Sequence, residues 1–386
     1  MARNAQRVAL LIETSTSWGS GIVEGIADYA ARHCDWQFFL EPRGRFEQLL
    51  LPDAWQGDGV IARVTHRPLA EQLIRNGLPS VNVSWFDYGE GAIPRCTADE
   101  QGTGRECGEY FLERGFRHYA YCGSMNRPGY VDRFGESFVD AVRARGFPCH
   151  VFEPKYHIEQ GATWNRAMEE LRGWIASLPK PVALLAFESV RGRHVTEACR
   201  LEEIDVPGDV AVLGGDHDEL STRISSPKLS TINHLPQRVG YKAAELLAHL
   251  MAGGKPPAEP ILLPASGIVT RQSTDTLAVE DPLVARAIRF IRANAHLPIQ
   301  VSDVLEEVPL SRRALELRLH RALGHSPAAE IRRTRLHLAK RLLVDTTHPM
   351  PWVAAHSGFE HPEVLSRVFR RELGMTPTAY RRQFFH

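Results

Sequence analysis

The chain has 386 residues, 43% hydrophobic and 24% charged, which is ordinary for a soluble globular protein of two or three domains. No apolar run approaches the ~20 residues of a membrane helix, and the N-terminus lacks a secretory apolar region, so we exclude a membrane partner and expect a cytoplasmic protein. The six scattered cysteines show no Cys-x-x-Cys spacing, which excludes a disulfide framework and a zinc site. The formal net charge is zero, but residues 277–386 hold seventeen Lys and Arg against eleven Asp and Glu, and the remainder holds 29 against 35, so a nucleic-acid-binding part attached to an acidic part is predicted.

Strand and helix patterns alternate through the first two thirds of the chain. Strands alternating with helices form parallel sheets, and this many units favour two doubly wound α/β lobes over one. We expect the lobes to meet near Gly115. The predicted strands are 7–13, 36–40, 59–62, 79–84, 118–122, 149–152, 182–187 and 210–214, and the helices between them are 20–31, 68–75, 101–114, 133–145, 164–177 and 191–203.

The next helix, 236–251, ends at a cluster of Gly and Pro, and strand patterns at 261–263 and 267–270 follow. Residues 271–281 are polar and aperiodic, which is typical of a linker. The predicted domains are a core of two lobes at 1–272, with the chain recrossing near 216–235, a linker at 273–283, and a second domain at 284–386.

Polar and aromatic side chains follow the predicted strands. In open α/β sheets, ligands bind beyond the carboxyl ends of the strands. Carboxylates, amides and arginine suit sugar hydroxyls, and an indole suits the C–H face of a sugar ring. Each such residue has an alternative role as a helix cap or loop hydrogen bond, as for Asp99 before a helix. The candidate ligand-binding residues are Trp18, Asn82, Arg133, Glu188, Ser189 and Asp216.

Enzymatic motifs are absent from the sequence. The glycines at 17–21 have the wrong spacing for Gly-x-Gly-x-x-Gly, and no phosphate-binding Gly-x-x-x-x-Gly-Lys-Ser/Thr occurs. Pro148-Cys149-His150 is similar to the acceptor motif of DNA alkyl transferases, but Val151 stands where that motif has Arg. We therefore predict no catalytic residue, no cofactor and no metal.

Two stretches resemble the LacI-type regulatory core, which is related to periplasmic sugar-binding proteins. They are 17–26, and 213–220 followed by 227–232; the resemblance covers residues 6 to 272. It implies that a sugar lies between the lobes in contact with Asp216 and Arg133. Ser189 departs from the family, which usually has Asp or Asn at that position, so the resemblance does not specify the sugar.

An internal repeat marks the last third of the chain, where 321–329 and 371–379 share Arg, Leu, Gly, a hydroxyl residue, Pro and Ala in the same order. A short helix, a turn and a second helix precede each stretch. In the first copy the helices are 301–308 and 312–323, and in the second they are 352–356 and 362–373, while 282–293 and 327–344 are the further helices. This is the helix-turn-helix plan, in which the second helix enters the major groove.

Residues 284–386 resemble the AraC/XylS-type DNA-binding domain through Gly358-Phe359, Phe369 and Gly374-Met-Thr-Pro-Thr-Ala-Tyr-Arg381. The resemblance implies base contacts from outward residues near the start of each second helix. For any one arginine, a solvated helix face or a phosphate contact is the alternative. The candidate DNA-binding residues are Arg312, Arg313, Glu316 and Leu317 in the first copy, and His361, Glu363, Ser366 and Arg367 in the second.

The order of the two parts is uncommon and resembles the regulators of xylose operons. This implies an activator whose lobes close on a pentose, D-xylose, and whose homodimer presents four helix-turn-helix units to double-stranded DNA beside RNA polymerase. The competing hypothesis is an architectural DNA-binding protein whose first part only dimerises.

Overall fold

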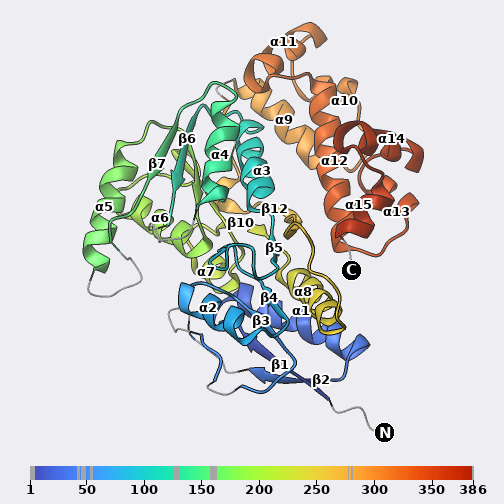
Figure 1. The fold of residues 1–386 in the computed structure, drawn as a ribbon. Coiled ribbons are helices and arrows are strands. Elements are labelled where there is room, and N and C mark those ends of the chain that lie inside the picture. The colour runs from blue at the N-terminus through green and yellow to red at the C-terminus, as the bar shows by residue number, and fades with distance from the viewer. Residues whose placement is uncertain are drawn as a thin grey trace.

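The computed structural model describes residues 5–40, 44, 49–52, 55–124, 131–156, 163–276, 278–279 and 281–384. It contains two α/β lobes and a helical domain that lies beside the second lobe (Figure 1). The predicted fold class is confirmed.

The first lobe is a parallel sheet in the order β2-β1-β3-β4. Its strands are almost entirely apolar where they are central, because a parallel sheet is covered on both faces. The chain returns to the first lobe at residues 236–251, which form α8 and pack against α1. The elements are β1 (Gln6–Leu11), α1 (Ser17–His33), β2 (Trp36–Leu40), β3 (Gly59–Ala62), α2 (Arg67–Asn76), β4 (Ser80–Asn82) and α8 (Pro236–Met251).

The second lobe is a sheet in the order β12-β10-β9-β8-β6-β7, parallel except for β12. Helices α3 and α4 cover one face, and α5 and α6 cover the other. The elements are α3 (Glu100–Leu112), β6 (His118–Cys122), α4 (Arg133–Arg143), β7 (Cys149–Phe152), α5 (Trp164–Ser177), β8 (Val182–Ala186), α6 (Ser189–Leu201), β9 (Val210–Gly214), α7 (Glu219–Ile224), β10 (Ser230–Asn233) and β12 (Gly267–Val269).

Two short strands at the crossing between the lobes, β5 (Cys96–Ala98) and β11 (Ile261–Leu263), pair in parallel. Helix α3 follows β5 directly and packs on α4, with Phe111 and Phe138 fully buried between them. The prediction of a lobe boundary near Gly115 is therefore wrong, because the chain already enters the second lobe before α3. It leaves again after β10 and returns between β11 and β12.

The predicted linker begins too early. Residues Gln272–Thr274 form a 3-10 turn in which Ser273 and Thr274 are fully buried. Ser273 donates a 2.6 Å hydrogen bond to the carbonyl oxygen of Val212, so these polar residues belong to the core of the second lobe.

The helical domain holds two small cores, one for each helix-turn-helix unit. Ser311 caps α11 by accepting from the backbone N–H of Ala314, and left-handed Gly324 ends that helix, which has the predicted bounds 312–323. The helices are α9 (Pro282–Asn294), α10 (Val301–Glu307), α11 (Arg312–Leu323), α12 (Pro327–Asp345), α13 (Met350–His356), α14 (Pro362–Leu373) and α15 (Pro377–Phe384). Among the residues described, no helix is both long and apolar enough to cross a membrane.

Candidate functional site

Aromatic side chains from both lobes meet between the sheets. Trp18, in the first turn of α1, lies 5.8 Å from Trp85, which follows β4. Trp85 meets Phe187, which follows β8, edge to face at 6.3 Å, and Trp18 meets His234, which follows β10, at 6.1 Å. Such an apolar wall suits the C–H face of a sugar ring.

Asp216 stands directly beyond β9 and is held by the start of α6. Its Oδ1 accepts from the backbone N–H of Ser189 at 2.6 Å and from the Ser189 hydroxyl at 2.5 Å. Ser189 is fully buried. Ser189 therefore fixes the Asp216 carboxylate through Oδ1. The other carboxylate oxygen, Oδ2, accepts no hydrogen bond from Ser189.

Two polar atoms near this wall have no hydrogen-bond partner among the described residues, namely Nε1 of Trp85 and Nδ1 of His234. The other ring nitrogen of His234 lies 2.7 Å from the carbonyl oxygen of Gly215, which can only accept, so Nε2 carries the hydrogen. Burial lowers the pKa of His234. A neutral ring therefore offers an acceptor, and Trp85 offers a donor, to a ligand hydroxyl.

A pocket of about 420 Å³ opens beside these groups, within the range of small-molecule sites. It brings together α1, the loop after β9 and the crossing after β10. Its lining includes Ser17, Trp18, Asp216, His217, Asn233 and His234.

The lobes also touch through a hydrogen bond from the Ser17 hydroxyl to Oδ1 of Asp218, at 2.9 Å. Burial of Asp218 acts to raise its pKa, but hydrogen bonds from Ser221 and Ser17 outweigh it and lower that pKa. The contact is thus made by an ionised carboxylate, and a change in the angle between the lobes must break or rebuild it.

Three other predicted ligand residues lie differently. The Asn82 amide accepts from the backbone N–H of Val64 and Ser84 and donates to the carbonyl of Phe86, so in this structure it shapes a loop. Arg133 is exposed at the start of α4, and Glu188 is half-buried at the N-cap of α6.

Neither Phe187 nor His234 was identified from the sequence as a site residue. His234 follows β10, a strand that was not predicted, and the rule that ligands bind at carboxyl ends of strands would have found it.

The predicted DNA-reading residues of the first unit are all exposed on α11. Arg312 and Glu316 pair along one side at 3.3 Å. Leu317 is 57% exposed, so its apolar side chain is open to solvent on this face. Leu315 and Leu319 are fully buried on the opposite face.

The second unit repeats this arrangement on α14. His361, Glu363 and Arg367 are exposed and Ser366 is half-buried, while Leu365 and Phe369 are fully buried. The two reading helices therefore present one outward face each, and α12 joins the two units (Figure 1).

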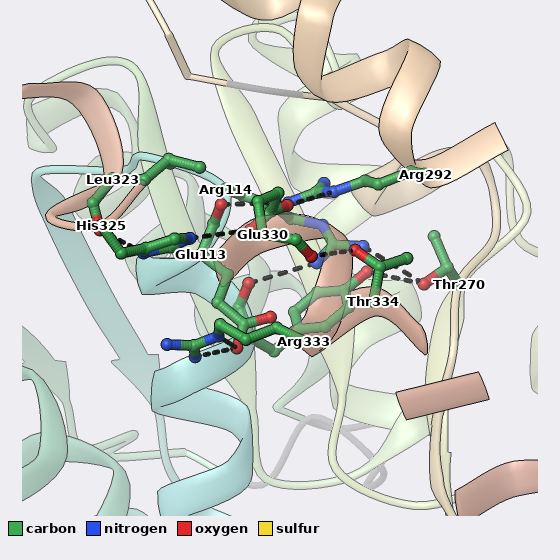
Figure 2. Close-up of polar contacts among 10 residues, drawn as sticks. Glu113, Arg114, Thr270, Arg292, Leu323, His325, Glu330, Arg333 and Thr334 are labelled. Atoms are coloured by element: carbon green, nitrogen blue, oxygen red, sulfur yellow. Dashed lines mark hydrogen bonds and ion pairs between the residues drawn. The ribbon is translucent and has the colours of Figure 1, made fainter. Parts of the chain in front are cut away.

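A polar junction ties the helical domain to the second lobe (Figure 2). Arg333 of α12 donates to Oε1 of Glu113 from Nη2 and, at 3.1 Å, from Nε. Arg292 of α9 donates to the Glu113 carbonyl at 3.0 Å and pairs with Glu330. His325 lies 2.8 Å from that same carboxylate.

The Glu330 carboxylate at the centre of this junction is almost fully buried. Burial alone acts to raise its pKa, but the hydrogen bond from His325 and the charge of Arg292 outweigh this and lower it. Glu330 is therefore ionised at neutral pH. Because Glu113 follows α3, whose first turn comes directly after β5 at the crossing between the lobes, one helix connects that crossing to the contact with the helical domain.

Three family models match successive parts of the chain. Residues 7–91 match the XylR N-terminal domain, 109–274 a periplasmic binding protein-like domain, and 304–383 a helix-turn-helix domain.

Relatives that match the chain over its whole length are also found. The xylose operon regulatory protein of Escherichia coli K12 is 28% identical over 394 residues, covering 99% of this chain and 98% of that protein. Its counterpart in Haemophilus influenzae is 27% identical and covers 99% of both. A solved structure, described as that of the xylose-binding transcription activator xylR, covers both chains fully with a TM-score of 0.64 and 26% identity.

Proposed function

We propose that this chain, a sugar-responsive transcription regulator with the domain order of the xylose operon regulators, activates genes of pentose use in the cytoplasm when D-xylose enters the cleft between its two lobes. The observation that carries the proposal is the pocket that Asp216, held by Ser189, shares with Trp18, whose ring belongs to an aromatic cluster from both lobes. The full-length relatives are regulators and do not favour an architectural protein.

The proposed mechanism is a shift between two arrangements of the lobes. A sugar that contacts both lobes binds the closed arrangement better, and it can move the equilibrium only by that difference in affinity. We propose that α3 carries the change to the Glu113–Arg333 contact, and that a homodimer then presents its four reading helices to DNA where RNA polymerase can bind.

A panel of pentoses and hexoses tested by calorimetry checks the proposed ligand. We expect D-xylose to bind, and its epimers to bind more weakly, because a buried site rejects a sugar that leaves a polar group unpaired. Operator binding measured with and without each sugar then identifies the effector. Absence of binding by every member of the panel would contradict the proposal and favour a first part that only dimerises.

Arg313 and Arg367 test the assignment of α11 and α14 as readers. If each reads a guanine, its replacement by Ala is expected to cost about 1–3 kcal/mol at one base position and to relax the preference there. Binding to a library of operator variants measures this. Arg75→Ala, which removes an exposed cation from the first lobe, is the control. A uniform loss across all sequences would show that the arginine contacts phosphate instead.

A further inference from the structure

Unpaired cations gather where the second lobe faces the first helix-turn-helix unit. Arg117 precedes β6, Arg145 follows α4 and Lys180 precedes β8, so all three lie on the edge formed by the amino ends of the strands, opposite to the candidate sugar site. Neither the Arg117 nor the Arg145 side chain makes an ion pair or hydrogen bond with a described residue, and both are exposed. Among the residues described, Lys180 donates to the carbonyls of Ala176 and Leu178 and to no carboxylate.

This edge and the last turn of α11 enclose two adjoining cavities of about 510 and 230 Å³, and Arg117 and Arg321 line both. Three carboxylates line these cavities, and two of them are paired, Asp281 with Arg318 at 3.0 Å and Glu113 with Arg333, while Glu109 is the third. The positive charge is therefore local, although the part of the chain before residue 277 carries an excess of six acidic residues.

The exposed ridge of α11 connects this cluster to the reading residues. Arg313, Leu317 and Arg321 are spaced four residues apart and are exposed, so they lie along one side of the helix. Eight residues of helix span about 12 Å, which is close to the ~12 Å width of the major groove. When Arg313 lies at the base edges, Arg321 and the neighbouring lobe therefore come to the phosphates that border the groove.

We propose that the amino-end edge of the second lobe binds the DNA backbone beside the groove that α11 enters, through Arg117, Arg145 and Lys180. The inference rests on the DNA binding proposed for α11. The operator then contacts the second lobe and α11 together, so DNA affinity depends on how that lobe is oriented against α11. By linkage, DNA and sugar affect each other's affinity equally.

The test uses the full-length protein with Arg117, Arg145 and Lys180 all changed to Gln, and measures operator affinity from low to moderate salt. Each lost phosphate contact is expected to lower the slope of log affinity against log salt by about 0.9. We therefore expect the slope to fall by roughly 2 to 3, with the base preference and the sugar affinity unchanged. The control is the triple variant Arg32→Gln, Arg75→Gln and Lys255→Gln, which removes equal charge from exposed positions elsewhere.

An unchanged salt slope in the first triple variant overturns the inference, and so does an equal change in the control variant. Thermal unfolding with inorganic phosphate distinguishes another use of the cluster. If phosphate stabilises the wild type but not the variant, and the slope stays the same, the cavities hold a small anion and the DNA inference is wrong. Failure of the proposed function would give a different result, because the wild-type protein would then show no operator preference at all.

Discussion

Asp216→Asn is expected to remove the response to sugar while DNA binding by α11 and α14 persists. The substitution keeps the shape of the side chain, but it removes the charge and replaces one acceptor oxygen by a donor. The remaining oxygen can still accept from Ser189, so the fold is retained. A hydrogen bond to a charged group is worth about 1.5–3 kcal/mol, which corresponds to a loss of roughly 10- to 150-fold in sugar affinity.

Calorimetry with the best sugar of the panel, followed by operator binding with and without that sugar, measures the two consequences separately. Asp28→Asn makes the same change at an exposed site on α1 and serves as the control. Sugar binding by Asp216→Asn that equals binding by the control would remove Asp216 from the site. Loss of basal DNA binding would instead indicate that Asp216 supports the fold.

The bounds of an element could be predicted where it is long enough to show the apolar period of a helix or a strand. Helices α5, α8, α11 and α14 have the predicted bounds, because their apolar stripes and terminal Pro or Gly residues are local signals. Strands β5 and β10 have only three and four residues, which are too few to show a clear period of two. The crossing between the lobes was therefore placed wrongly, since pairing of β5 with β11 decides it.

The candidate site shows the same division. The rule that ligands bind beyond carboxyl ends selected Trp18 and Asp216, because strand ends are visible in the sequence, and the two residues line one pocket in the structure. The direction in which a side chain points is not visible. Asn82 was selected by the same rule, but loop geometry turns its amide to the backbone of Val64, Ser84 and Phe86. Val64 comes from a separate segment after β3, which no local pattern around Asn82 encodes.

Gly358→Ala is expected to be strongly destabilising, more so than the same change at Gly374. Both glycines have left-handed backbones, with φ of +76° and +70°, and for any L-residue this conformation costs about 1–2 kcal/mol. At Gly374 a Cβ would meet no atom within 4 Å. At Gly358 it would overlap the carbonyl oxygen of Ala295, a backbone atom that cannot rotate away. We expect a loss of stability of about 3 kcal/mol or more there.

The loss of stability caused by Gly358→Ala should affect both helix-turn-helix units. Its turn, in the second unit, rests on the loop that follows α9 in the first, and Arg335 fixes that loop by donating to the carbonyls of Leu297 and Ile299. Urea unfolding of the full chain, together with operator and sugar binding, measures the effect. Gly358→Ala should lower the stability of the helical domain and its operator affinity while sugar affinity is kept, and Gly374→Ala should show only the smaller backbone cost. Equal destabilisation by the two variants would mean that the loop yields to the new methyl group, and that the spacing of the two reading helices does not depend on this contact.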